Sequence, residues 1–149
     1  MKEQRYISHS PEETWEIAGR IVADAPGRLL LALHGELGSG KTCFVKGIAL
    51  ALGIDQPIMS PTFTIVREYR GTRPLYHVDL YRLNNPNEVL AIGFEEYLQA
   101  DGITAVEWAE RAGDLIPQKA TRIRFEALPE PDERAITVSF PDDHDSGGR

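Results

Sequence analysis

Cysteine is nearly absent from this chain of 149 residues, where Cys43 is the only one. A disulfide framework is therefore excluded, and a single thiol is typical of a reducing compartment, so we expect a cytoplasmic protein. Long apolar runs are also missing. Runs such as residues 29–33 are far shorter than the roughly 20 residues that span a membrane, and no apolar stretch follows residues 1–5. We therefore expect no membrane contact and no secretory signal.

Positive charge is scarce as well. Lys and Arg number 16 against 23 Asp and Glu, which gives a net charge of -7. Because affinity for nucleic acid depends on Lys and Arg, an acidic chain is a poor independent binder of RNA. Any contact with RNA is expected to be made mainly through partner proteins.

The composition is otherwise that of an ordinary globular protein, with 42% hydrophobic and 26% charged residues. A chain of this length buries roughly 70% of its unfolded surface, which is enough for one core without crosslinks. We predict one domain over residues 1–140. Residues 141–149 are small, polar and acidic, and are expected to form a disordered tail.

Strands and helices alternate along this domain. Ser10, Pro11 and Glu13 predict the start of the first helix through a capping box, in which the Ser and Glu side chains each accept from an amide at the helix start. Further helices are expected at 41–52, after Asn85, and at 94–100; strands are expected at 28–34, 63–69, 75–81, 102–108, 122–126 and 135–140. This order predicts an α/β fold. We expect a P-loop NTPase domain whose central sheet is mostly parallel, with some antiparallel strands and helices on both faces.

The strongest motif is Gly35–Thr42, which matches G-x-x-x-x-G-K-S/T between an apolar strand and a helix. Its glycines let backbone N–H groups surround a phosphate, and the helix dipole adds positive potential. Lys41 would reach the β and γ phosphates, and Thr42 would hold Mg²⁺. The residues predicted to bind a nucleotide here are Gly35, Leu37, Gly38, Ser39, Gly40, Lys41, Thr42 and Cys43.

Two acids end predicted strands. Asp79 has the position of the second acid that a P-loop needs for its metal, and Glu107 either holds Mg²⁺ or orients the attacking water. Ligands of open α/β sheets lie outside the carboxyl ends of the strands, where both acids are expected. Trp108 either stacks near the nucleotide or closes the core. His34 and His77 have no partner at ligand spacing, and we interpret both as structural.

Other segments leave alternatives open. From the residues alone, Ser60–Thr64 is more typical of a plain turn than of a loop that senses a γ-phosphate. The spacing does not distinguish a charge-stabilising arginine among Arg67, Arg70, Arg73, Arg82, Arg111 and Arg134. An N-K-x-D element is absent, which disfavours a GTPase. The short segment between Asp79 and Glu107 has no arginine-rich lid, which disfavours a small-molecule kinase.

Four ordered motifs closely resemble the bacterial TsaE family, the small ATPases of tRNA threonylcarbamoyladenosine biosynthesis. They are Gly35–Thr42, Ser60–Thr64, Tyr76–Leu83 and Val106–Trp108, and the resemblance covers about residues 6–140. It implies that Lys41, Asp79 and Glu107 are catalytic. Thr42 and Glu107 would be the Mg²⁺ ligands, with Asp79 as the Walker-B-type acid.

The resemblance also changes the interpretation of other residues. It implies that Ser60, Pro61 and Thr62 form a switch-like loop, that Trp108 lies close to the nucleotide, and that Ser10 and Pro11 lie near its base. The family usually has Asp and Ala where Glu36 and Ser39 stand, and Thr or Ser in place of Cys43. Since Cys43 is a thiol, we expect nucleotide binding to be sensitive to oxidation.

The implied function is that of an accessory protein that binds ATP or ADP with Mg²⁺ and hydrolyses ATP weakly. It would act on the TsaD–TsaB pair, which transfers a threonylcarbamoyl group to adenosine in tRNAs reading A-starting codons. Two alternatives stay open. One is a P-loop kinase for a small molecule, and the other is an adaptor that binds nucleotide without hydrolysing it.

Overall fold

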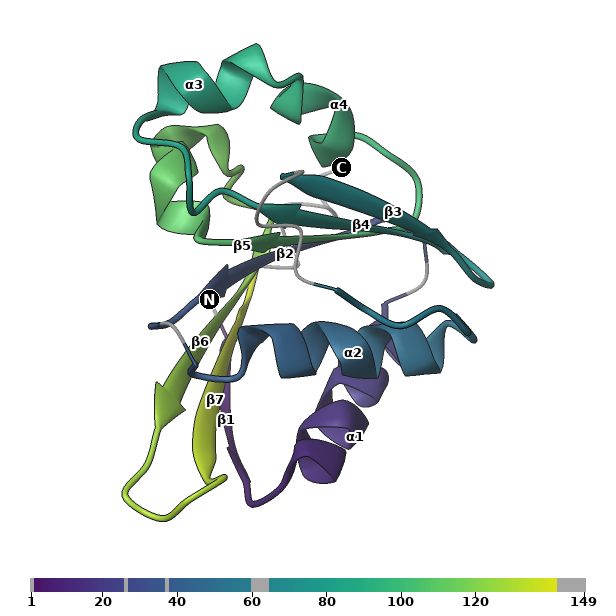
Figure 1. Ribbon diagram of the computed structural model, residues 1–149, viewed down its shortest axis with the longest axis vertical. Helices are drawn as coiled ribbons and strands as arrows, with labels where there is room; N and C mark the ends of the chain where they lie inside the picture. Colours follow the sequence, from purple (N-terminus) through teal and green to yellow (C-terminus); the bar gives the residue numbers. More distant parts are fainter. Residues whose placement is uncertain (1, 26, 37, 60–64, 142–149) are drawn as a thin grey trace.

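The computed structural model describes residues 2–25, 27–36, 38–59 and 65–141. These residues form a seven-stranded sheet with helices on both faces (Figure 1). The strands are β1 (Lys2–Ser8), β2 (Leu29–His34), β3 (Val66–Arg70), β4 (Pro74–Asp79), β5 (Ile103–Glu107), β6 (Thr121–Ala127) and β7 (Arg134–Phe140). The helices are α1 (Pro11–Ala23), α2 (Lys41–Ala51), α3 (Pro86–Ala91), α4 (Phe94–Leu98) and the 3-10 helix η1 (Ala109–Leu115).

The sheet has the strand order β1-β7-β6-β2-β5-β4-β3. The central strands β6, β2, β5 and β4 are parallel, whereas β3 pairs antiparallel with β4 and β7 lies antiparallel between β6 and β1. The predicted α/β fold with a mostly parallel centre is therefore confirmed. The parallel strands bring the carboxyl ends of β2, β4 and β5 to one edge of the sheet.

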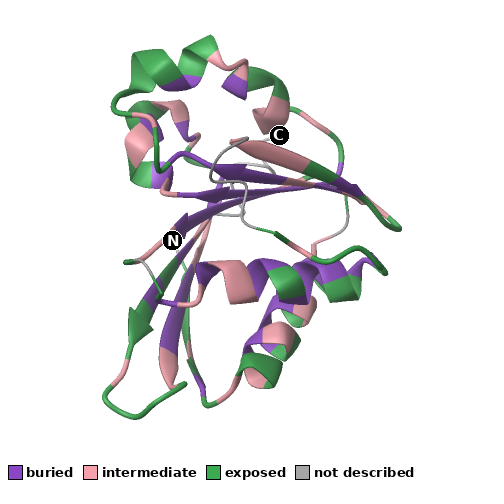
Figure 2. Ribbon diagram, in the orientation of Figure 1, coloured by how far each residue is buried: buried purple, intermediate pink, exposed green. Residues whose placement is uncertain are grey.

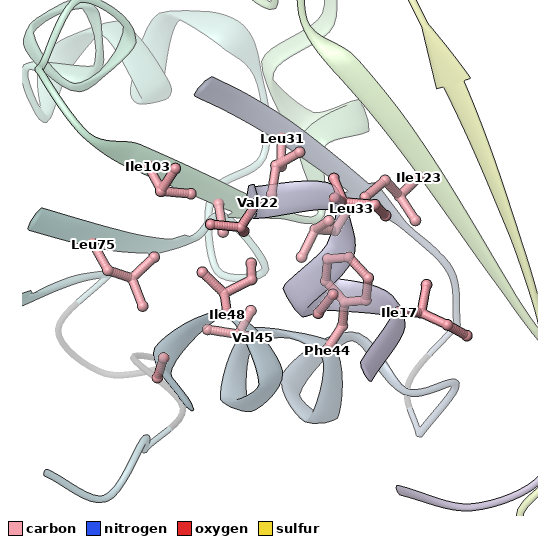
Figure 3. Close-up of a cluster of buried hydrophobic side chains, with 14 of the residues drawn as sticks. Ile17, Val22, Leu31, Leu33, Phe44, Val45, Ile48, Leu75, Ile103 and Ile123 are labelled. Atoms are coloured by element: carbon pink, nitrogen blue, oxygen red, sulfur yellow. The ribbon is translucent and has the colours of Figure 1, made fainter. Parts of the chain in front are cut away.

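Strand β2 is buried on both faces, which explains its continuous apolar sequence. Leu31 and Leu33 pack with α1 and α2 in one apolar cluster, and Figure 3 shows this cluster around Phe44 of α2. Leu30 and Ala32 point to the opposite face, where a second cluster contains residues of α3, α4 and η1. The buried residues are concentrated in the central strands and on the inner sides of the helices (Figure 2).

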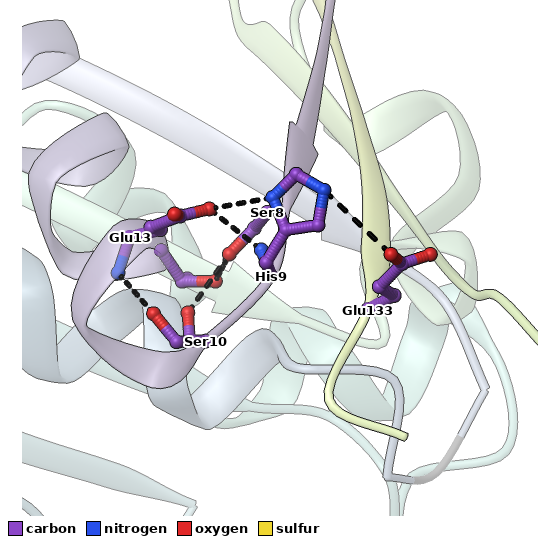
Figure 4. A network of polar contacts seen from close by, with 6 residues as sticks. Ser8, His9, Ser10, Glu13 and Glu133 are labelled. Atoms are coloured by element: carbon purple, nitrogen blue, oxygen red, sulfur yellow. Dashed lines mark hydrogen bonds and ion pairs between the residues drawn. The ribbon is translucent and has the colours of Figure 1, made fainter. Parts of the chain in front are cut away.

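The first helix begins as expected in one respect and differs in another (Figure 4). The Ser10 hydroxyl accepts from the Glu13 amide at 3.1 Å, and Pro11 occupies the first turn. The Glu13 carboxylate does not return to the Ser10 amide as predicted. The carboxylate accepts instead from the His9 amide at 2.7 Å. It also lies 3.0 Å from the His9 Nδ1 atom, so His9 makes two polar contacts with Glu13. The His9 ring also lies 3.6 Å from Glu133, which ties the start of α1 to the β6–β7 loop.

Two elements were not anticipated. Strand β1 is an edge strand that pairs with β7, and most of its side chains are exposed, so no apolar alternation announces it. Helix η1 follows β5 directly. The predicted strand at 63–69 begins at Val66, and its first residues lie outside the described part. The expected tail also falls outside it from residue 142 onward. Within the described ranges, no helix has the length and apolar character that crossing a membrane requires.

Candidate nucleotide-binding site

The glycine-rich loop connects the end of β2 at His34 to the start of α2 at Lys41. At Gly35 a Cβ atom would lie 2.5 Å from the Ser39 hydroxyl and 2.9 Å from the carbonyl oxygen of Phe125, so a side chain does not fit. Gly40 has a φ of 114°, a conformation that glycine adopts readily and other residues rarely adopt. The loop therefore depends on these two glycines for its backbone path. Leu37 lies outside the described residues.

The Lys41 side chain folds back over this loop. Its ammonium donates to the Gly35 carbonyl oxygen at 2.6 Å and lies 3.8 Å from the centre of the Trp108 ring. Burial lowers the pKa of Lys41, while nearby carboxylates, Glu107 first among them, act in the opposite direction. A phosphate bound in the loop would replace these weak partners with a full negative charge, and so would favour the protonated ammonium.

Two acids meet at the carboxyl edge of the sheet. Asp79 and Glu107 occupy opposite positions on the parallel strands β4 and β5, and each is only 4% exposed. The Glu107 Oε2 atom accepts from the Thr42 hydroxyl at 3.2 Å, and the Asp79 Oδ1 atom accepts from the Tyr81 amide at 2.9 Å. The structure thus brings Asp79 and Glu107, which are far from the glycine-rich loop in the sequence, close to Lys41 and Thr42.

The oxygen donors at this edge suit Mg²⁺. Among the described residues, no group of three His, Cys, Asp or Glu side chains is arranged to hold a metal ion without help. Mg²⁺ is usually bound by one or two carboxylates together with waters and substrate phosphates. The hydroxyl of Thr42 beside the carboxylate of Glu107, with Asp79 on the neighbouring strand, fits that mode of binding.

Trp108 forms the wall of the site beside Lys41. Its backbone has a φ of 58°, and its ring lies 5.0 Å from the Tyr81 ring between centroids. The Arg111 guanidinium lies 5.8 Å from the centroids of both rings and donates to the Leu83 carbonyl oxygen at 2.8 Å. Trp108 also packs against the second apolar cluster. Trp108 therefore contacts Lys41 and also helps to close the core, while its expected place near the nucleotide stays a prediction.

A small cavity of about 110 Å³ lies between the loop and the start of α1, and we call it the α1 pocket. It is lined by Ser10, Pro11, Thr14, Gly40, Cys43, Asp132 and Arg134. Ser10 and Pro11 thus line the same pocket as Gly40, and their expected place near the base of a nucleotide stays a prediction.

The arginines that the sequence left undecided have different positions. The Arg134 guanidinium donates to the Gly38 carbonyl oxygen at 3.4 Å, and its stem lies 3.7 Å from the position of a Cβ at Gly40. Arg73 instead donates to three carbonyl oxygens near the end of α1, which is a structural role. Asp132 lines the α1 pocket but was not predicted from the sequence. The sequence of a turn does not indicate which distant loop the turn will contact.

The structure gives both histidines a carboxylate partner. His77 is fully buried, and its Nε2 atom lies 2.6 Å from the Glu107 Oε2 atom. His34 lies 3.4 Å from a carboxylate oxygen of Glu110. Both contacts join residues from different elements, so the sequence spacing gave no sign of them. The predicted switch residues Ser60, Pro61 and Thr62 lie outside the described residues.

Cys43 is predicted to react slowly. Burial raises the pKa of its thiol, so the folded chain holds less of the reactive thiolate at neutral pH than the unfolded chain does. We expect iodoacetamide labelling, followed by mass spectrometry, to be slower in the folded than in the urea-unfolded protein at pH 7, and to accelerate between pH 7 and 9. Saturating ADP should slow labelling further. Equal rates in folded and unfolded protein at pH 7 would contradict this environment, whereas slow labelling would argue against strong oxidation sensitivity.

A glycine-rich loop between the buried parallel strand β2 and helix α2, with buried acids at the ends of β5 and of β4 beside it, is the arrangement typical of P-loop domains. The family model described as "Threonylcarbamoyl adenosine biosynthesis protein TsaE" matches residues 8–136. The chain therefore belongs to the TsaE family of tRNA threonylcarbamoyladenosine biosynthesis proteins.

Individual relatives agree over nearly the whole chain. The TsaE protein of Bacillus subtilis (strain 168) is 43% identical over 140 residues, which cover 93% of this chain and 87% of that protein. The TsaE protein of Treponema pallidum (strain Nichols) is 38% identical over 138 residues, covering 91% and 99%. The structure titled "Crystal structure of Bacillus subtilus YdiB" superposes with a TM-score of 0.82 at 37% identity, covering 96% of this chain and 88% of that one.

Proposed function

We propose that this chain binds ATP and ADP with Mg²⁺ at the Gly35–Thr42 loop and hydrolyses ATP slowly. It would act in the cytoplasm as an accessory ATPase for the TsaD–TsaB pair, in the threonylcarbamoyl modification of adenosine in tRNAs that read A-starting codons. The single observation that carries the proposal is the contact of Thr42 with Glu107 directly beside the buried ammonium of Lys41. Membership of the TsaE family supports the pathway.

The chemistry follows from what each group offers. The loop amides and Lys41 would neutralise charge on the β and γ phosphates, which is the main requirement of phosphoryl transfer. Thr42 and Glu107, supported by Asp79, would hold Mg²⁺, which neutralises charge that develops on the phosphate oxygens. Asp79 or Glu107 would orient the attacking water.

The charge of the chain agrees with a role that depends on partners. The net charge of -7 favours an arrangement in which the partners make most of the contacts to tRNA.

The test is phosphate release from Mg-ATP by the purified chain, alone and with the TsaD–TsaB pair. We expect slow release that rises when the pair is added. Release that depends on a small hydroxylated acceptor and ignores the pair would favour the kinase alternative. Tight nucleotide binding with no release under either condition would contradict the ATPase and favour the adaptor.

A further inference from the structure

We propose that His77 is a positioning residue that fixes the Glu107 carboxylate for Mg²⁺, an inference that rests on the proposed function. The His77 Nε2 atom lies 2.6 Å from Glu107 Oε2, and the Thr42 hydroxyl donates to the same oxygen at 3.2 Å. His77 is 0% exposed and Glu107 is 4% exposed, so water does not compete for this contact. The carboxylate is thereby held from β4 and from α2 at once.

The contact also selects a tautomer of His77. Because a carboxylate oxygen only accepts, the Nε2 atom must carry the proton that is shared with Glu107. The Nδ1 atom is buried and has no hydrogen-bond partner among the described residues. An N–H at Nδ1 would be a buried donor without an acceptor, which is unfavourable. The geometry therefore assigns the Nε2–H tautomer, and this tautomer aims the donor at Glu107.

A purely structural role explains this histidine poorly. Its neighbours on the same face of the sheet are Leu75, two residues before it on β4, and Ala105, opposite it on β5, and both belong to the apolar cluster. An apolar side chain of similar size would fill the same volume. It would also avoid burying a ring nitrogen that has no hydrogen-bond partner. Among the described residues, the polar contact of the imidazole is to Glu107. Groups that orient a metal ligand in this way typically contribute about 10- to 100-fold in metal affinity.

The experiment compares His77→Leu, which removes the donor, with His77→Gln, which keeps an N–H donor on a side chain of similar reach. The quantity measured is the ratio of the ADP dissociation constants without and with Mg²⁺, by isothermal titration calorimetry. We expect His77→Leu to reduce this ratio by about 10-fold or more, with metal-free ADP binding unchanged, and His77→Gln to restore most of it. His34→Leu is the matched control, because the His34 ring lies near the carboxylate of Glu110 and not that of Glu107. It should leave the ratio unchanged.

Several results would overturn the inference. These are an unchanged ratio in His77→Leu, an equal loss of metal-free binding, or a Gln variant no better than Leu. A wild-type chain that binds ADP without any dependence on Mg²⁺ would contradict the metal part of the proposed function and this inference with it. The tautomer of His77 can be measured without any ligand. Nitrogen-15 NMR of the histidine side chains should show His77 protonated at Nε2, and a proton at Nδ1 alone would overturn the assignment.

Discussion

Replacing Lys41 with Ala is expected to weaken the binding of ATP and ADP by about 10- to 100-fold, and to lower ATP turnover by about 100- to 1,000-fold. The ammonium lies at the start of α2 inside the loop, and its present partners are a carbonyl oxygen and an aromatic face rather than an acid. A phosphate can therefore bind the ammonium without breaking an ion pair. No other side chain among the described residues of Gly35–Thr42 carries a positive charge.

The measurement is nucleotide binding by calorimetry together with phosphate release, and circular dichroism reports the fold. Lys46→Ala is the matched control, because Lys46 lies on the same helix with its side chain exposed. We expect Lys46→Ala to bind nucleotide as the wild type does. If Lys41→Ala kept wild-type affinity and turnover while remaining folded, the P-loop would not be the nucleotide site.

The Glu107→Gln substitution is expected to lower Mg-ATP hydrolysis by about 100-fold or more, with a small effect on stability. Glutamine has nearly the same shape, so it fills the same buried volume and its amide oxygen can still accept from Thr42 or His77. It lacks the negative charge that a Mg²⁺ ligand or a water-orienting acid supplies. The loss should therefore appear in turnover and in the magnesium dependence of binding rather than in folding.

Glu110→Gln is the control for Glu107→Gln. Glu110 lies three residues further along, contacts His34, and has a side chain that is 49% exposed. Removing its charge is expected to change hydrolysis by only a few-fold, because an exposed charge is screened by water and salt. Turnover in Glu107→Gln within a few-fold of the wild type would show that neither the metal nor the attacking water depends on this acid.

Local patterns predicted the parts of the site that lie close together in the chain. The apolar sequence of β2 and the contiguous Gly35–Thr42 motif predicted the loop, because strand, glycines and helix follow one another directly in the chain. The capping residue Ser10 likewise predicted where α1 begins. These features depend on residues a few positions apart, whose interactions are determined by backbone geometry.

The remaining parts depend on how distant strands pair. His77 meets Glu107 only because β4 lies beside β5 in a register that sets His77 against Ala105, two residues before Glu107. Arg134 reaches Gly38 because the β6–β7 loop ends beside the P-loop. Strand β1 is held by backbone pairing at an edge of the sheet and carries no apolar alternation. Such pairings are selected by the whole fold, so a single sequence does not reveal them.

The most direct test of the account is multiple-turnover threonylcarbamoylation of tRNA by the TsaD–TsaB pair with ATP present, comparing the wild-type chain with Lys41→Ala. The account predicts that the wild-type chain sustains repeated modification, and that the variant sustains about as little as the pair alone. Repeated modification with Lys41→Ala at the wild-type rate would contradict the claim that this chain acts through its nucleotide site.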